Sequence, residues 1–92
     1  MSNETSFAFA YRTAAEELME AIANPSYRNF RMAQTSATVA QAAAFTSWVR
    51  DGLPTAKPGD EWDIATRLSE SIVAAANYHG YHTISIDAEV RA

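Results

Sequence analysis

Aromatic and cationic side chains alternate in a short stretch of the chain around its first proline. Residues 24–31 read Asn-Pro-Ser-Tyr-Arg-Asn-Phe-Arg. Guanidinium groups bind phosphates through paired hydrogen bonds, and aromatic rings stack on nucleobases. A helix that begins in this stretch adds unsatisfied N–H groups and the positive end of its dipole. We therefore predict that Tyr27, Arg28 and Arg31 bind a small anionic ligand of the nucleotide type.

The same stretch has a purely structural interpretation. Tyr27 and Phe30 can pack one helix onto the preceding one, with the arginines in solvent. The arginines can equally pair with acids of the preceding helix, which are Glu16, Glu17 and Glu20. No acidic residue occurs between Glu20 and Asp51, a feature that fits either a local cationic patch or a buried, alanine-rich helix.

Other residues that can meet a ligand are spread along the chain. Tyr11 lies on the apolar face of the first helix, where its ring either closes a pocket or fills the core. Trp62, Thr66 and Arg67 of the third helix offer an aromatic ring, a hydroxyl and a cation to a second anion, or have only a structural role. His79 and His82 are interpreted as a helix end, because two histidines without a cysteine do not complete a zinc site.

The sequence contains few of the residues and motifs that catalysis usually needs. The 92 residues include three glycines and no cysteine, and they contain no glycine-rich phosphate loop. We expect a protein that is not an enzyme, with no catalytic residue, no metal and no cofactor. The net charge of -4 argues against binding to a nucleic acid polymer, because such binding rests on many cationic contacts with phosphate.

Three helices in one domain over residues 1–92 must position these side chains. The apolar spacing predicts helices over residues 4–23, 25–50 and 60–79. Asn24 is expected to cap the second helix, with Pro25 in its first turn, and Gly80 to end the third. The fold class is therefore all-α, a helical hairpin plus a third helix.

Each helix has apolar side chains that should face the core. The stripe of the first helix comprises Phe7, Tyr11, Ala15, Leu18 and Ile22. The second helix has two stripes, namely Ala33, Ala37, Ala40, Ala44 and Trp48 beside Val39, Ala42, Phe45 and Val49. The stripe of the third comprises Ile64 or Ala65, then Leu68, Ile72, Ala76 and His79. The apolar surface of the second helix is wider than one neighbour covers, so we expect a homo-oligomer.

The C-terminal residues 83–90 alternate between apolar and polar side chains, with the period of a half-buried strand. No other segment offers a partner strand, so this tail is either extended coil or a strand that pairs with another subunit. No signal sequence and no apolar run of about 20 residues is present, so we expect a cytoplasmic protein that does not enter membranes.

The turn Pro-Ser-Tyr-Arg at residues 25–28 is followed by Ala33, Thr35 and an alanine-rich helix that reaches Trp48. With these features the first two helices resemble the helical hairpin of phage anti-CBASS cyclic-nucleotide sponges, and a related hairpin occurs in anti-Thoeris sponges. The resemblance implies a homo-hexamer that sequesters cyclic dinucleotides, and in some members cyclic trinucleotides at a separate site, without cleaving them. Sequestration in the host cytoplasm would block CBASS-type antiphage signalling.

The resemblance also implies roles for individual residues. In that family a tyrosine of the first helix stacks on a base, and Tyr11 occupies this position. A lysine in the following turn meets the ligand, whereas Ser26 occupies that position here. Arg28 or Arg31 is then the candidate for the missing charge. The candidates for the trinucleotide site are Thr66 and Arg67.

Two other functions fit the same sequence. The wide alanine face and the acidic first helix can dock on a partner protein, as in a small inhibitor or an antitoxin-like module. The chain can also be a structural subunit of a larger particle, which predicts open-ended assembly in place of a closed ring. The state of assembly separates these alternatives, because a stable hexamer hides the apolar stripe and a monomer exposes it.

Overall fold

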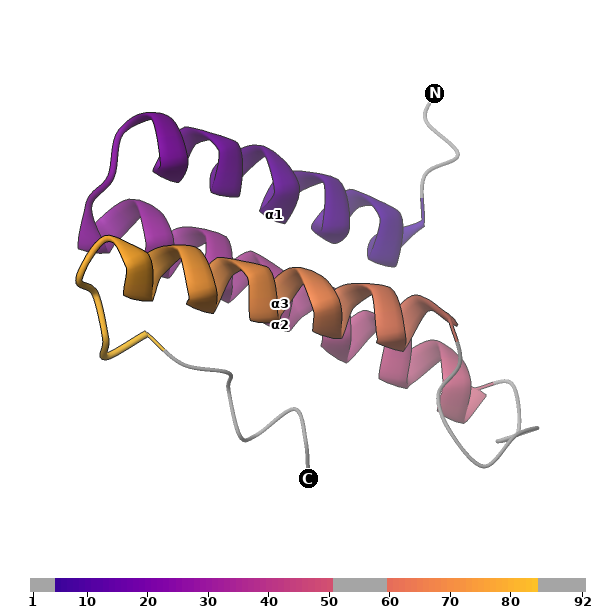
Figure 1. The fold of residues 1–92 in the computed structure, drawn as a ribbon. Helices are drawn as coiled ribbons and strands as arrows, with labels where there is room; N and C mark the ends of the chain where they lie inside the picture. Colours follow the sequence, from indigo (N-terminus) through magenta and orange to yellow (C-terminus); the bar gives the residue numbers. More distant parts are fainter. Residues whose placement is uncertain (1–4, 51–59, 85–92) are drawn as a thin grey trace.

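Three helices make up the part of the chain that the structure describes. The computed structural model describes residues 5–50 and 60–84. Helix α1 covers Ser6–Ala23, α2 covers Tyr27–Arg50 and α3 covers Asp60–Tyr78 (Figure 1). No strand occurs within these two described ranges. The predicted all-α class is confirmed, and the observed helix bounds agree with the predicted ones to within two residues.

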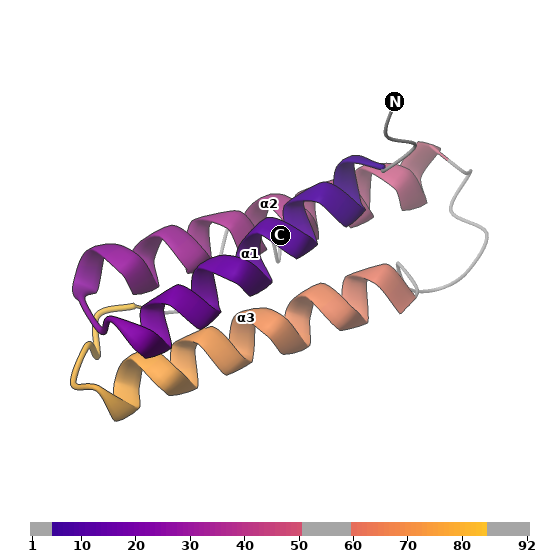
Figure 2. The same ribbon diagram turned by 90° about the horizontal axis from the view of Figure 1, so that it is seen from above.

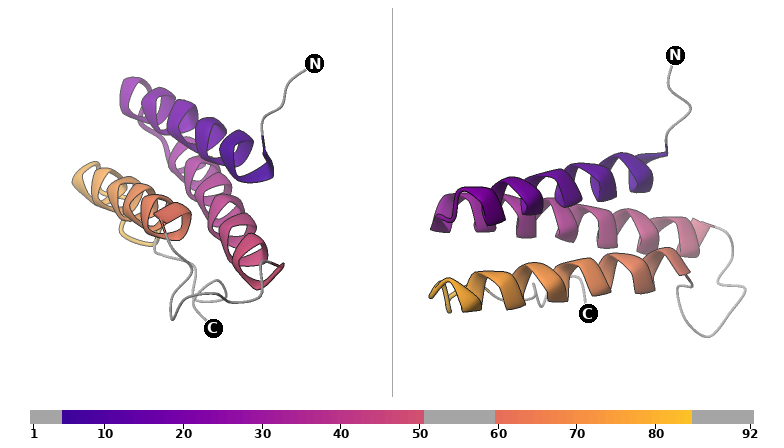
Figure 3. Two further views of the ribbon diagram at one scale, coloured as in Figure 1. Left: turned by 90° about the vertical axis from the view of Figure 1, so that its right-hand side faces the viewer. Right: turned by 45° about the horizontal axis from the view of Figure 1, so that its top comes forward.

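Helix α2 is the central element of the bundle. It runs antiparallel to α1 and antiparallel to α3, and it contacts both (Figures 1 and 2). α1 and α3 touch each other at fewer places. The turn from α1 to α2 and the C-terminal end of α3 therefore lie at the same end of the molecule, as the views in Figure 3 also show.

Alanines provide most of the buried contact between α1 and α2. The buried alanines of α1 are Ala10, Ala14 and Ala21, and those of α2 are Ala33, Ala37, Ala40 and Ala44. Because each of these side chains is a single methyl group, the two helices can approach closely. The predicted stripe of α2 is confirmed at its four alanines, and the side chain of Trp48 lies outside the described part.

The predicted apolar stripe of α1 is not the centre of its buried face. Phe7, Tyr11, Ala15 and Leu18 are only half-buried, and Ile22 is 53% exposed. A neighbouring row of alanines takes the centre, because methyl-sized side chains let α1 lie close to α2. The larger side chains border this contact, where they reach clusters that include residues of α3.

Helix α3 packs through the apolar residues that its periodicity predicts. Ala65, Ile72 and Ala76 are fully buried, and Leu68 is half-buried. His79, the last predicted member of the stripe, follows the end of α3 at Tyr78. It is exposed on one side, while its ring stacks against Phe30. In the second apolar stripe of α2, Val39, Ala42 and Val49 are exposed. Phe45 is partly exposed, and its ring packs against Trp62 of α3.

Side-chain hydrogen bonds from two buried glutamines join α2 to α3 inside the bundle. The Gln34 amide Nε2 donates to Ser69 Oγ at 2.8 Å, and both residues are buried. The Gln41 amide Nε2 donates to Thr66 Oγ1 at 3.1 Å, and Gln41 is also buried. Buried polar groups need such partners because desolvation otherwise costs free energy, so these bonds help to determine how α3 lies on α2.

The turn between α1 and α2 differs from the prediction. Ser26, not Asn24, caps α2, since its Oγ accepts a hydrogen bond from the backbone N–H of Asn29 at 3.1 Å. Asn24 caps the C-terminal end of α1, where its N–H donates to the Glu20 carbonyl at 2.8 Å. Pro25 precedes α2 and does not lie in its first turn. Serine and asparagine are both good caps, so local sequence could not distinguish them.

The predicted extended tail over residues 83–90 lies almost wholly outside the described part of the chain. Of these residues only Thr83 and Ile84 are described, and Ile84 is buried. The alternating pattern beyond Ile84 therefore stays a prediction. Among the helices that the structure describes, none combines the length and the apolar character that crossing a membrane requires.

Candidate ligand-binding site at the aromatic end

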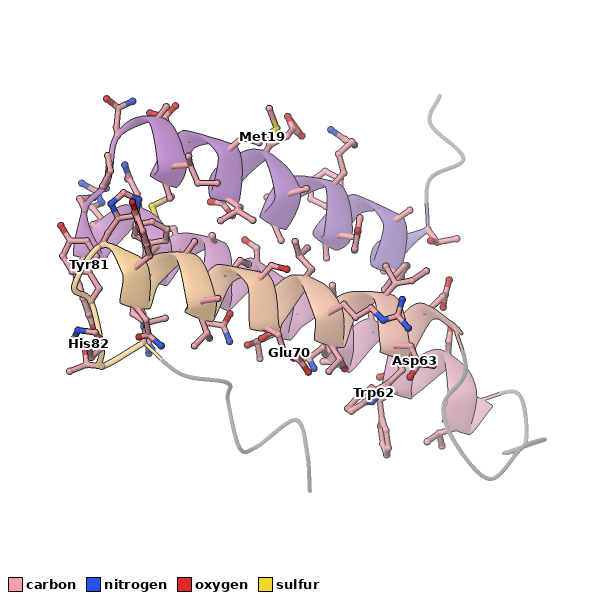
Figure 4. All side chains as sticks on the ribbon, in the orientation of Figure 1. Met19, Trp62, Asp63, Glu70, Tyr81 and His82 are labelled. Atoms are coloured by element: carbon pink, nitrogen blue, oxygen red, sulfur yellow. The ribbon has the colours of Figure 1, made fainter. Side chains whose placement is uncertain are left out.

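Five aromatic side chains gather where α2 begins and α3 ends. We call this cluster the aromatic end, and its members are Tyr27, Phe30, Tyr78, His79 and Tyr81. The antiparallel packing of α2 and α3 brings the two segments together. Figure 4 labels Tyr81 at this end of the bundle, near the turn that joins α1 to α2.

Phe30 is the buried base of the aromatic end. It has no exposed surface, and it packs in a cluster with Ala21 of α1, Ala76 of α3 and Ile84. The His79 ring stacks against Phe30 with ring centroids 5.6 Å apart. The structural interpretation of the sequence therefore holds for Phe30, which joins α2 to both other helices.

Tyr27 meets the segment that follows α3. Its ring lies edge-to-face with Tyr81, with the centroids 6.5 Å apart and an interplanar angle of 67°. Edge-to-face is one of the favoured geometries for aromatic pairs, because the positive edge of one ring faces the negative face of the other. Tyr27 remains 48% exposed, so part of its ring is open to solvent.

The position of Tyr81 depends on a tight turn after α3. Gly80 has a φ of 90°, a conformation that glycine adopts without the penalty that a Cβ atom brings. The Tyr81 N–H then donates to the Ala76 carbonyl at 2.8 Å, and the ring lies 5.8 Å from that of Phe30. The sequence correctly indicates a helix end at Gly80, but it does not indicate that Tyr81 joins the candidate site.

Two exposed arginines adjoin the aromatic end. Arg28 and Arg31 both lie in the first turns of α2. Neither forms a salt bridge with any residue in ranges 5–50 and 60–84. Their charges are therefore not neutralised within the described part of the chain, and both guanidinium groups can accept an anion.

The three acids that could have paired with these arginines make other contacts. Glu16 pairs with Arg12 at 3.2 Å. Glu17 accepts a hydrogen bond from the Ser36 hydroxyl, and Glu20 accepts one from the Asn24 side-chain amide at 2.9 Å. All three contacts involve residues of α1, its C-terminal cap or the facing side of α2. The predicted alternative in which these acids neutralise Arg28 and Arg31 is therefore wrong for this structure.

Ser26 has a structural role as the N-cap of α2. Its half-buried hydroxyl caps α2, as described above, and it stands one residue before Tyr27. The residue thus lies at the aromatic end, but its oxygen already accepts a hydrogen bond from Asn29. If Ser26 also binds a ligand, its hydroxyl must do so while it continues to cap α2.

Tyr11 is not brought to the aromatic end of the same chain. Its ring packs against Phe7, with centroids 5.8 Å apart, and beside the buried cluster of Ala10, Ala40 and Ala65. From Tyr11 to the end of α1 the helix rises by about 18 Å. Antiparallel α2 runs back by about 6 Å from its first residue to Arg31, so about 12 Å along the bundle separates the backbones of Tyr11 and Arg31.

Thr66 and Arg67 lie nearer to the opposite end of the bundle. The Thr66 hydroxyl oxygen accepts the hydrogen bond from Gln41, so it belongs to the contact between α2 and α3. Arg67 is exposed and makes no salt bridge with a described residue. Trp62, the aromatic neighbour that the sequence offers on α3, packs against Phe45 with centroids 6.2 Å apart.

A separate cleft of about 590 Å³ opens at the end of the bundle where α1 and α3 begin. The residues that line it are Thr5, Ser6, Phe7, Ala43, Thr46, Ser47 and Glu61. None of the predicted ligand-binding residues lines it. The Glu61 carboxylate would repel a phosphate, so this cleft does not suit the predicted anionic ligand.

The described residues also contain no group of three or more histidines, cysteines or acids that could hold a metal ion. No model of a known protein family matches the chain, and no match was found among curated proteins or solved structures. The geometry thus defines a class of site: an aromatic and cationic surface at one end of a three-helix bundle.

Proposed function

We propose that the protein is a non-enzymatic binding protein that sequesters cyclic oligonucleotide second messengers. The carrying observation is the edge-to-face pair of Tyr27 and Tyr81 beside Arg28 and Arg31, whose charges no described residue neutralises. The rings offer a surface for a base, and the guanidinium groups offer paired donors to a phosphate. A cyclic oligonucleotide carries both groups in a compact, dianionic or trianionic molecule.

Sequestration requires only that the surface bind the ligand. It requires stacking and charge, held in place before the ligand arrives, and it requires no general base or nucleophile. The resemblance to anti-CBASS sponges supports the same interpretation. We propose that the protein acts in the cytoplasm of a host cell, where sequestration blocks CBASS-type signalling. Thr66 and Arg67 are proposed as a second site, for cyclic trinucleotides.

The proposal includes a homo-oligomer, for which we propose a hexamer. No charged residue occurs between Arg31 and Arg50. Apolar side chains are exposed along this part of α2, namely Met32, Val39, Phe45 and Val49. An uncharged, partly apolar outer face fits a contact between subunits. An oligomer would also let Tyr11 of a neighbouring subunit reach the aromatic end, and it would give the alternating tail over residues 83–90 a strand to pair with.

Isothermal titration calorimetry tests the proposal directly. The purified protein is titrated with cyclic di-AMP, cyclic GMP-AMP and cyclic tri-AMP, and with linear AMP and inorganic phosphate as controls. We expect binding of at least one cyclic oligonucleotide and recovery of the intact ligand when the complex is heated. The absence of binding to every cyclic oligonucleotide, or recovery of a hydrolysed product, would contradict the proposal.

The exposed face of α2 also supports a second candidate function, a small inhibitor or antitoxin-like module that docks on a partner protein. The distinguishing measurement is the mass in solution by light scattering. A monomer favours the protein-binding module, since its apolar face is then available to a partner. A closed hexamer favours the sponge, whereas open-ended assembly favours a structural subunit of a larger particle.

A further inference from the structure

The aromatic end contains two arginines, and the helical geometry separates them. Residues four apart on a helix lie on the same face, one turn from each other. Arg31 is four residues after Tyr27 and therefore shares its face. Arg28 follows Tyr27 directly, so its side chain leaves the helix about 100° away around the axis. Only Arg31 is placed to act together with the exposed part of the Tyr27 ring.

Tyr81 is the second ring on this side of α2. Its ring contacts Tyr27 edge-to-face, and it also packs against the buried Phe30, with ring centroids 5.8 Å apart. The turn at Gly80 and the hydrogen bond from the Tyr81 N–H to Ala76 determine where its backbone lies. Tyr81 is therefore held in place by contacts that need no ligand, which lowers the ordering cost of binding.

We propose that Tyr27, Tyr81 and Arg31 form the subsite for one nucleotide unit, and that Arg28 is not part of it. The base lies against the tyrosine pair, and the adjacent phosphate accepts hydrogen bonds from the Arg31 guanidinium. This inference rests on the proposed function and specifies its ligand further: the subsite takes a phosphate attached to a base and discriminates against a phosphate without one. It also makes the turn after α3, and not only the hairpin of α1 and α2, part of the site.

The test compares matched variants of the full chain by calorimetry, with whichever of cyclic di-AMP, cyclic GMP-AMP or cyclic tri-AMP the wild-type protein binds most tightly. Loss of a stacked base or of a phosphate contact should weaken binding by about tenfold or more. We expect this loss for Arg31→Ala and for Tyr81→Leu, which keeps an apolar side chain over Phe30. We expect a smaller loss for Arg28→Ala than for Arg31→Ala. We expect less than a twofold change for the control Arg12→Ala, which removes a cation of α1 that pairs with Glu16, and for Tyr81→Phe, which retains the ring.

Equal losses for Arg28→Ala and Arg31→Ala would overturn the assignment of the charge, and unchanged binding by Tyr81→Leu would overturn the assignment of the ring. Chemical-shift changes in the wild-type protein give a measurement that no substitution can disturb. On addition of the cyclic nucleotide, the amide signals of Arg31 and Tyr81 should shift, and ribose 5-phosphate should leave the Tyr81 signal in place. If the wild type binds no cyclic oligonucleotide, the proposed function itself fails; if it binds and Tyr81 does not shift, only this inference fails.

Discussion

The amide of Gln34 donates a hydrogen bond to the hydroxyl of Ser69 across the buried face between α2 and α3, with 2.8 Å between the nitrogen and the oxygen. Both residues are almost fully buried, with 3% and 0% of their surfaces exposed. The bond helps to hold the antiparallel arrangement that brings the end of α3 to the start of α2. The candidate site thus depends on a contact that lies well inside the bundle.

Replacing Ser69 by alanine should therefore destabilise the fold. The change removes the acceptor of a buried amide N–H, which typically costs about 1–3 kcal/mol. Urea denaturation followed by circular dichroism measures the loss. The matched control is Ser71→Ala on the same helix, where the exposed hydroxyl only donates to the Arg67 carbonyl at 3.0 Å. This control should change the free energy of unfolding by less than about 0.5 kcal/mol. Equal stabilities of the two variants would contradict the prediction.

Gly80→Ala should destabilise the turn that positions Tyr81. A Cβ atom at this residue would meet nothing within 4 Å, so crowding contributes nothing. The cost is that of a positive φ in an L-residue with a side chain, about 1–2 kcal/mol. Gly80→Asn should lose less, because asparagine tolerates this region better. Thermal unfolding of both variants checks the order, and a fully stable Gly80→Ala protein would show that the turn does not need glycine.

Substitutions at Ser26 should separate its capping role from any contact with the ligand. Loss of the cap in Ser26→Ala should lower the free energy of unfolding by about 1 kcal/mol. Ser26→Asp keeps a cap acceptor and should retain stability, but its carboxylate stands near Arg28 and Arg31 and should weaken the binding of an anion. Thermal unfolding and calorimetry together measure the two effects. If Ser26→Asp is as unstable as Ser26→Ala, Ser26 does not cap α2.

Val39→Glu should disrupt assembly without disrupting the subunit. Val39 is 54% exposed on the uncharged outer face of α2, and a carboxylate buried there between subunits would be costly. We expect smaller particles in sedimentation velocity, with the helical circular dichroism signal unchanged. Ala74→Glu, an exposed position on α3, is the control and should leave the assembly intact. Wild-type particle size for Val39→Glu would exclude this face as the contact between subunits.

Mixing two inactive variants should restore part of the binding if the site is shared between subunits. If a neighbouring subunit supplies Tyr11 to the aromatic end that carries Arg31, Tyr11→Ala and Arg31→Ala each remove half of a shared site. Random assembly of equal amounts of the two variants should regenerate about a quarter of the sites of a cyclic oligomer. Calorimetry on the co-refolded mixture measures this fraction. No recovery, from variants that each retain wild-type assembly, would place Tyr11 outside the site.

Much of the fold was predictable because the signals are local. Apolar spacing predicts three helices, and the alanine row from Ala33 to Ala44 predicts the buried face of α2. Gly80 predicts the end of α3, since a helix stop depends on the conformational freedom of one residue. The buried face of α1 was harder to predict, because hydrophobicity favours the larger side chains and close packing selects the row of Ala10, Ala14 and Ala21.

In the candidate site, too, some residues could be assigned from local sequence and others only from the packing of the helices. The sequence by itself determined that Tyr27, Arg28 and Arg31 stand together at the start of a helix, because neighbours in sequence remain neighbours in a helix. Only the tertiary structure decided that Tyr81 joins them and that Tyr11 of the same chain does not. The first outcome depends on how α3 packs against α2, and the second on where each residue lies along the axis of the bundle. Neither the packing nor these positions can be read from a local sequence pattern.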